Sequence, residues 1–192
     1  MNQLAVRVIK VGGSLFDFPA LPEAFRDWLA AQTPAVNILL AGGGKLADVI
    51  READRTWGLG AEAAHWLAID VLAASSRLLA AILPDACLER DWERLCQRVQ
   101  RRAAGPPIVF GPVDFLQRQE AQLPPPALPH GWHVTTDSIA ARIATVLDAD
   151  ELVLFKSAEA PPQPQPPYVD EYFARAAEGL KSVRFVNLRG GN

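Results

Sequence analysis

The first residue whose type and position suggest a chemical role is Lys10, which stands two positions before the pair Gly12 and Gly13. Glycine lets backbone approach a ligand closely and adopts positive φ at little cost. Successive N–H groups in such a turn, followed by the start of a helix, attract phosphate, and the Lys10 charge would be aimed at the same anion. The pattern favours a phosphate site; the alternative is a strand that ends in an ordinary tight turn with a solvated lysine.

Lysine is rare in this chain, because 15 of the 19 basic residues are arginine and the four lysines are Lys10, Lys45, Lys156 and Lys181. Two of the four stand beside glycine-rich turns, and a third ends a predicted strand. A lysine ammonium is a compact point charge that suits phosphate oxygens where the planar arginine fork does not fit. This usage supports a phosphate site, although chance in an arginine-rich background is the competing explanation.

A second unit of strand, glycine turn and helix follows the first. Residues 4–11 and 36–41 are apolar runs typical of buried strands, the second run ends in Gly42–Gly44, and a helix is predicted from Lys45 to Trp57. Neither turn matches GxGxxG, and the second lacks the Ser/Thr of a Walker A loop. Because the carboxyl ends of parallel strands meet at one sheet edge, we expect both turns to face one ligand site.

Strands and helices alternate along the rest of the chain. Helices are expected over 22–31, 60–83, 91–102 and 168–178, and one more begins at Thr135, Thr136 or Asp137; strands are expected over 85–88, 107–111, 152–155 and 183–186. The pattern predicts an α/β fold, a three-layer α/β/α sandwich with a mainly parallel central sheet. The proline-rich stretches 123–129 and 161–167 are interpreted as loops within a single domain spanning 1–192.

Composition excludes several classes of protein. Hydrophobic residues make up 49% of the chain, charged residues 21%, and the net charge is −3, which does not indicate disorder or a nucleic-acid partner. The apolar stretch 63–83 contains Asp70 and Arg77 and is predicted to be a buried helix rather than a membrane span. The first residues run directly into a strand and there are only two cysteines, so we expect no signal peptide and a cytoplasmic location.

Three blocks taken together resemble the amino acid kinase superfamily, which includes acetylglutamate, aspartate, carbamate, uridylate and isopentenyl-phosphate kinases. The blocks are residues 9–14 (IKVGGS), residues 41–44 (AGGG), and residues 135–141 (TTDSIAA) followed by 152–156 (LVLFK). They occur in family order and span most of the chain. Residues 64–69 and 128–141 are also similar to a small aspartokinase-like branch that includes the aminomethylfuran phosphate kinase of methanofuran biosynthesis.

The resemblance implies an amino acid kinase-like fold with an acceptor-binding half at about 1–130 and a nucleotide-side half at about 131–192. It implies ATP as the phosphoryl donor, Mg²⁺ carried with ATP, and no metal bound by the protein alone. The implied catalytic residues are Lys10, Lys156 and Asp137, with Asp137 orienting the two lysines. ATP and phosphate would be bound by Lys10, Gly12, Gly13, Ser14, Lys156 and Ser157.

The acceptor would be bound by Gly42, Gly43, Gly44, Asp48, Arg51, Thr135 and Thr136. On the helix after the second turn, Arg51 would suit an anionic acceptor and Asp48 an amine. Simpler explanations stay open: Asp137 as a helix N-cap, Lys156 as a surface lysine, and Asp48 with Arg51 as a helix ion pair. The Asp-Gly-rich turn that many relatives carry after Lys156 is replaced here by residues 157–160 and a run of prolines.

The function predicted on these grounds is ATP-dependent phosphorylation of a small molecule, with a phosphorylated aminomethylfuran as the expected acceptor. One alternative is a carboxylate kinase that forms an acyl phosphate; another is a catalytically degenerate nucleotide-binding subunit. A homo-oligomer, a dimer or larger, is expected, with no nucleic-acid or membrane partner.

Overall fold

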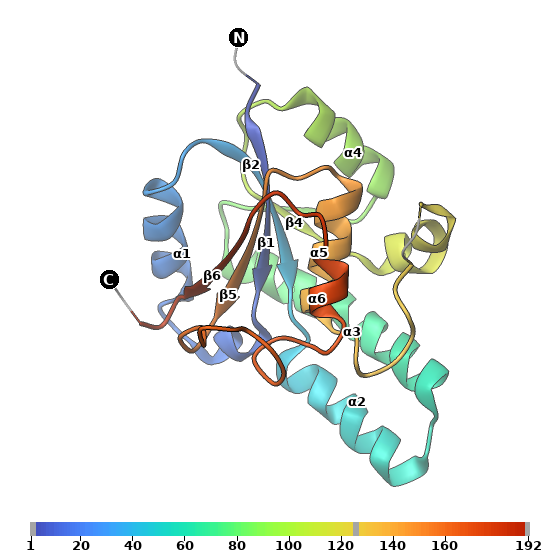
Figure 1. Cartoon of the computed structure of the whole chain (residues 1–192). Coiled ribbons are helices and arrows are strands. Elements are labelled where there is room, and N and C mark those ends of the chain that lie inside the picture. Colours follow the sequence, from blue (N-terminus) through green and yellow to red (C-terminus); the bar gives the residue numbers. More distant parts are fainter. Residues whose placement is uncertain (1–2, 125–126, 191–192) are drawn as a thin grey trace.

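The computed structural model describes residues 3–124 and 127–190, and its centre is a six-stranded sheet with the order β3-β4-β2-β1-β5-β6 (Figure 1). Every adjacent pair of strands is parallel. Pro125 and Pro126, which belong to the predicted loop 123–129, lie outside the described residues. The strands are β1 Ala5–Val11, β2 Ala35–Ala41, β3 Cys87–Glu89, β4 Ile108–Phe110, β5 Glu151–Lys156 and β6 Val183–Asn187.

Helices cover both faces of the sheet, as the continuous apolar runs of β1, β2 and β5 require. Alternate residues along the strands belong to two separate hydrophobic cores, one on each face of the sheet. Val8 packs on the side of α5, and Ile9 packs on the side of α1. The three-layer α/β/α architecture predicted from the sequence is therefore confirmed. The helices are α1 Leu21–Ala30, α2 Gly44–Trp57, α3 Ala61–Ile82, α4 Trp92–Arg101, α5 Thr136–Val146 and α6 Phe173–Ala176.

Helix α3 is the one described helix that is long and apolar enough, by length and composition, to cross a bilayer. Its inner side contributes Ile69 and Leu72 to the core beside α5, and Leu79 to the core beside α1. Ser75 and Ser76 are also fully buried in this helix. The helix therefore packs as a core helix of the α/β fold, as expected from its sequence.

The two glycine turns are in direct backbone contact. A Cβ on Gly13 would lie 2.2 Å from the Gly44 nitrogen, and a Cβ on Gly42 would lie 2.5 Å from the Gly13 nitrogen. Gly44 also has a φ of +53°, a conformation that favours glycine. These glycines let the ends of β1 and β2 meet, so the two turns share one sheet edge as predicted.

The predicted helix over 168–178 is wrong in extent, since only Phe173–Ala176 is helical. The preceding residues make long-range contacts instead. The carboxylate of Asp170 accepts hydrogen bonds from the backbone N–H groups of Thr135 and Ser138, at 2.8 and 3.0 Å. These bonds hold residues 168–170 against α5 in place of continuing a local helix.

Candidate active site

The end of β1 and the end of β5 direct two lysines toward one aspartate on α5. Lys10 Nζ lies 2.8 Å from Asp137 Oδ1, and Lys156 Nζ lies 2.8 Å from Asp137 Oδ2. Strand alternation explains the convergence, because Lys10 and Lys156 occupy positions whose side chains point to the face that α5 covers. All three residues are buried.

Asp137 is the second residue of α5 and lies inside the helix. The N-cap is Thr135, whose side chain accepts from the Asp137 N–H. The N-cap explanation for Asp137 is therefore wrong, and each of its carboxylate oxygens lies 2.8 Å from a lysine Nζ. Likewise Lys156 is a buried lysine and not a surface one.

The charges of this cluster shift one another's protonation. Burial would raise the pKa of Asp137, but the positive charges of Lys10 and Lys156 outweigh burial and hold this pKa below its usual value. Burial and the like charge of Lys10 lower the pKa of Lys156 to about 8, against the opposing attraction of Asp137 and Asp170. The pKa of Lys156 therefore lies close to neutral pH, so this ammonium group loses its proton more readily than an ordinary lysine.

The chain that follows Lys156 returns to the site at Tyr168 and Asp170. The Tyr168 carbonyl accepts a hydrogen bond of 2.6 Å from Lys156 Nζ, and the Tyr168 ring lies 5.2 Å from the same atom. The Asp170 carboxylate accepts hydrogen bonds from the Thr135 hydroxyl, at 2.8 Å, and from the Ser138 hydroxyl. These add to the bonds that it accepts from the backbone N–H groups of the same two residues. Tyr168 and Asp170 therefore fix Lys156 and the start of α5, and sequence reasoning assigned a role to neither.

The predicted nucleotide-side residues gather at the same edge. Ser14 Oγ and Ser157 Oγ are hydrogen-bonded at 2.9 Å across the ends of β1 and β5. The Gly12 N–H donates to the Phe155 carbonyl at 2.9 Å, so this amide already has a partner within the sheet. In this turn the Gly13 N–H is therefore the candidate hydrogen-bond donor to a phosphate. Gly12 is needed because a side chain there would collide with the Phe155 carbonyl.

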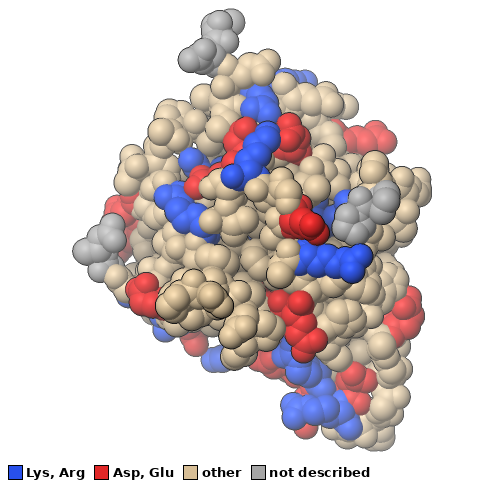
Figure 2. All heavy atoms as spheres, viewed as in Figure 1, with Lys and Arg blue, Asp and Glu red and all other residues tan. Residues whose placement is uncertain are grey.

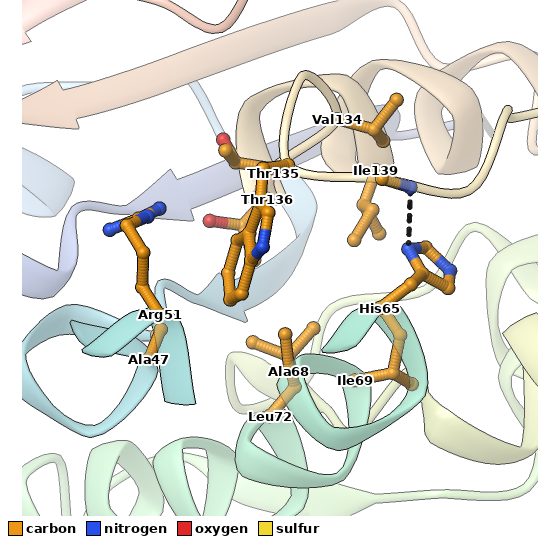
Figure 3. Close-up of a pocket in the computed structure, with 13 residues that line it drawn as sticks. Ala47, Arg51, His65, Ala68, Ile69, Leu72, Val134, Thr135, Thr136 and Ile139 are labelled. Carbon is orange, nitrogen blue, oxygen red and sulfur yellow. Dashed lines mark hydrogen bonds between the residues drawn. The ribbon is translucent and has the colours of Figure 1, made fainter. Parts of the chain in front are cut away.

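A cavity of about 70 Å³, the α2–α3 pocket, opens beside the lysine cluster, between α2, α3 and residues 131–139 (Figure 3). Gly43, Arg51, Thr135 and Thr136 line it, as four of the residues predicted for the acceptor. Most of its remaining lining is apolar and comes from Ala47, Ala68, Ile69, Leu72, Val134 and Ile139.

The other predicted acceptor residues lie outside this pocket. Gly44 and Asp48 line a neighbouring hollow of about 420 Å³, together with Gly13 and Ser14. The Gly42 N–H donates to the Val11 carbonyl at 2.8 Å. The Arg51 guanidinium lies 2.7 Å from Asp48 Oδ1, so the helix ion pair is formed.

Two pocket residues were missed from the sequence as site residues, His65 and Trp132. The His65 Nδ1 atom accepts a hydrogen bond of 3.3 Å from the Gly131 N–H (Figure 3), and burial lowers the pKa of His65 to about 4. Trp132 donates to Asp54 at 2.8 Å, and the Arg51 guanidinium lies 4.7 Å from its ring centroid. Both residues belong to the segments resembling the aspartokinase-like branch, which was the available signal.

Within residues 3–124 and 127–190, no three His, Cys, Asp or Glu side chains form a group that could hold a metal ion. On the face shown in Figure 2, acidic and basic side chains are interspersed. Ion pairs such as that of Arg55 with Glu52 on α2 place opposite charges next to each other.

The fold is shared with solved structures of kinases. The structure aligns with UMP kinases from Bacillus anthracis (TM-score 0.55, 13% identity, 83% of this chain and 67% of that one) and Ureaplasma parvum (0.52, 14%, 82% and 71%). It also aligns with a uridylate kinase from Archaeoglobus fulgidus (0.53, 18%, 81% and 64%). The chain therefore has the fold of these kinases, which is the fold that the resemblance in its motifs predicted.

Similarity in sequence gives a more specific relative than the shared fold does. Over 152 residues the chain is 22% identical to [5-(aminomethyl)furan-3-yl]methyl phosphate kinase of Methanocaldococcus jannaschii, covering 78% of this chain and 64% of the relative. This chain thus spans somewhat less than two thirds of the length of that relative and of the Archaeoglobus kinase. No family model matches the sequence.

Proposed function

We propose that this protein is an ATP-dependent kinase that phosphorylates a small acceptor bound in the α2–α3 pocket. The observation that carries the proposal is the buried Lys10–Asp137–Lys156 cluster at the sheet edge where both glycine turns meet. Phosphoryl transfer depends on positioning and on neutralising charge on the transferring group. Two cations oriented by one carboxylate, beside turns free of Cβ atoms, supply these two requirements.

Each part of the site has a place in the transfer. An acceptor oxygen forms a bond to the γ-phosphorus of ATP, the bond from that phosphorus to the β-phosphate bridging oxygen breaks, and ADP leaves. Lys10 and Lys156 would stabilise the negative charge on the transferring group and the leaving oxygen, while Asp137 keeps both ammonium groups in position. Gly13 and Ser14 would bind the phosphate chain, and Mg²⁺ carried with ATP would supply further charge neutralisation.

The pocket favours an acceptor with a small apolar body and an anionic group. Its walls are mainly apolar, and Arg51, which is paired with Asp48, is the cation that lines it. His65 is neutral at physiological pH, because its pKa is about 4, and adds no competing charge. A furan ring that carries a phosphate matches both features, so we propose the acceptor named for the Methanocaldococcus relative, with a diphosphate as product.

The test is ADP release from Mg-ATP with purified protein, with and without [5-(aminomethyl)furan-3-yl]methyl phosphate. We expect acceptor-dependent release that is lost in Lys10→Ala and kept in Lys181→Ala, a matched control whose side chain is 50% exposed. Circular dichroism would verify that both variants fold. The product is identified by ³¹P NMR, which separates a diphosphate from an acyl phosphate.

The outcomes separate the competing functions. Turnover with amino-acid carboxylates and none with the furan phosphate would replace our acceptor with the carboxylate-kinase alternative. Intact ATP binding without turnover on either acceptor class would refute the proposed acceptor. Absence of ATP binding would overturn the kinase proposal and favour a degenerate subunit.

A further inference from the structure

Trp132 gives the α2–α3 pocket a flat aromatic wall. This half-buried residue lies in a turn that is closed where the Val134 N–H donates to the Gly131 carbonyl at 3.2 Å. Two contacts with α2 hold the indole. Its N–H donates to Asp54 Oδ2 at 2.8 Å, and the Arg51 guanidinium lies 4.7 Å from the ring centroid. A side chain from a turn is thus fixed by a helix that lies 78 positions away in sequence.

The groups around the indole are themselves held in place. Asp54 Oδ1 accepts a hydrogen bond of 3.2 Å from the N–H of Gly60, the N-cap of α3. On the other side of the turn, the Gly131 N–H donates to His65 of α3. Both α2 and α3 therefore hold the Trp132 indole in position before a ligand enters, which lowers the ordering cost of binding.

The rest of the lining distinguishes one end of the pocket. Gly43 belongs to the second glycine turn and Thr136 directly precedes Asp137, so this end adjoins the lysine cluster and suits the phosphate of an acceptor. An acceptor with its phosphate at this end places its organic part beside Trp132. The same part meets apolar side chains of α2 and α3, which are those of Ala47, Ala68, Ile69 and Leu72 (Figure 3).

We infer that Trp132 is a specificity-determining residue, which selects acceptors whose phosphate is attached to a flat, conjugated ring. Such a ring stacks on the indole through the two π-systems, and this contact adds to the apolar area that the ring buries. A saturated ring of similar size is puckered and has no π-system, so it gains only the burial. The inference rests on the proposed function, because it concerns the acceptor in the same pocket, and it extends that acceptor to planar ring phosphates as a class.

The test is isothermal titration calorimetry of the full-length protein with benzyl phosphate and with cyclohexylmethyl phosphate. The two probes carry the same charged group on rings of equal carbon number, and they differ in whether the ring is planar. We expect the wild type to bind benzyl phosphate about 2-fold to 12-fold more tightly, which is the range that aromatic pairs provide. Trp132→Leu should bring the two dissociation constants together, whereas Trp132→Phe should keep most of the difference.

Trp57→Leu is the matched control, because it removes a tryptophan of α2 that is 78% exposed and lies outside the pocket. It should leave both affinities unchanged, and circular dichroism would verify that each variant folds. Equal affinity of the wild type for the two probes would overturn the inference, as would a preference for benzyl phosphate that persists in Trp132→Leu. Failure of the wild type to bind either probe would overturn it as well.

ADP release from Mg-ATP is measured separately, so that the inference and the proposed function can fail independently. Selective binding that depends on Trp132, without ADP release, would support the inference and count against phosphoryl transfer to this class of acceptor. ADP release with the furan phosphate, together with unchanged ring selectivity in Trp132→Leu, would support the kinase and overturn the role of Trp132.

Discussion

Replacement of Asp137 by asparagine tests whether the buried cluster is held together by its charges. The Asp137 side chain is 6% exposed and lies 2.8 Å from each of two lysine Nζ atoms. Removing one partner of a buried ion pair costs about 3–5 kcal/mol, because the remaining charge is left uncompensated. In Asp137→Asn, two like charges would stay buried side by side, so we expect a loss of about 4 kcal/mol in the free energy of unfolding.

This loss should depend on pH, because a lysine can avoid an unfavourable charge by releasing its proton. The pKa of Lys156 is already lowered to about 8 in the folded protein, and removal of the Asp137 charge lowers it further. Lys156 is then neutral in the folded variant at about pH 9 but still costly to charge at about pH 6. The destabilisation by Asp137→Asn is therefore expected to be largest near pH 6 and to shrink as pH rises.

Urea unfolding followed by circular dichroism measures the effect at both pH values. With a denaturant slope of about 2 kcal/mol/M, a loss of about 4 kcal/mol lowers the unfolding midpoint by about 2 M. Glu120→Gln is the control, because Glu120 forms an equally buried ion pair with Arg142 at 2.8 Å. Arginine does not release its proton in this range, so that loss should be equal at both pH values. A loss below about 1 kcal/mol for Asp137→Asn, or one independent of pH, would refute this account of the cluster.

Substitutions at Gly13 and Asp170 and the pH dependence of activity test other parts of the site. Gly13→Ala places a Cβ 2.2 Å from the Gly44 nitrogen and should lower the free energy of unfolding by about 1–3 kcal/mol, whereas Gly105→Ala meets no atom within 4 Å and should leave it unchanged. If the protein is a kinase, kcat/KM should fall as pH rises through about 8, where Lys156 loses its proton; a flat profile from about pH 7 to 10 would contradict this. Asp170→Asn should move that fall to lower pH, because the Asp170 charge raises the pKa of Lys156. Asp170→Ala should also cost about 1–2 kcal/mol in urea unfolding through loss of its bonds to α5, and an unchanged midpoint would refute that role.

The sequence by itself determined the sheet and pointed to the edge at which the candidate site lies. The apolar runs that became β1, β2 and β5 are buried on both faces, and such runs form parallel strands covered by helices. Each of the first two runs ends in glycines, which marks the carboxyl edge where ligands bind in open α/β sheets. These signals are local, because periodicity and turn chemistry depend on neighbours in the chain.

The tertiary structure alone decided how the site is assembled. Asp170 contacts Thr135 across 35 positions of sequence, and this long-range contact stands where the first part of a helix over 168–178 was predicted; only Phe173–Ala176 is helical. His65 and Trp132 come from α3 and a distant loop and meet at one pocket. No spacing rule encodes such pairs, because their proximity depends on how helices pack onto the sheet.

The glycines show both levels at once. Their positions in the sequence predicted two tight turns, but only the packed structure shows that Gly13 and Gly44 exclude each other's Cβ atoms. In the same packed structure the Gly12 N–H donates a hydrogen bond to the Phe155 carbonyl, so it is not free for a ligand. Sequence patterns therefore specified which residues reach the sheet edge, and tertiary contacts decided which of their atoms remain available to a ligand, because hydrogen-bond partners and steric contacts come mainly from elsewhere in the chain.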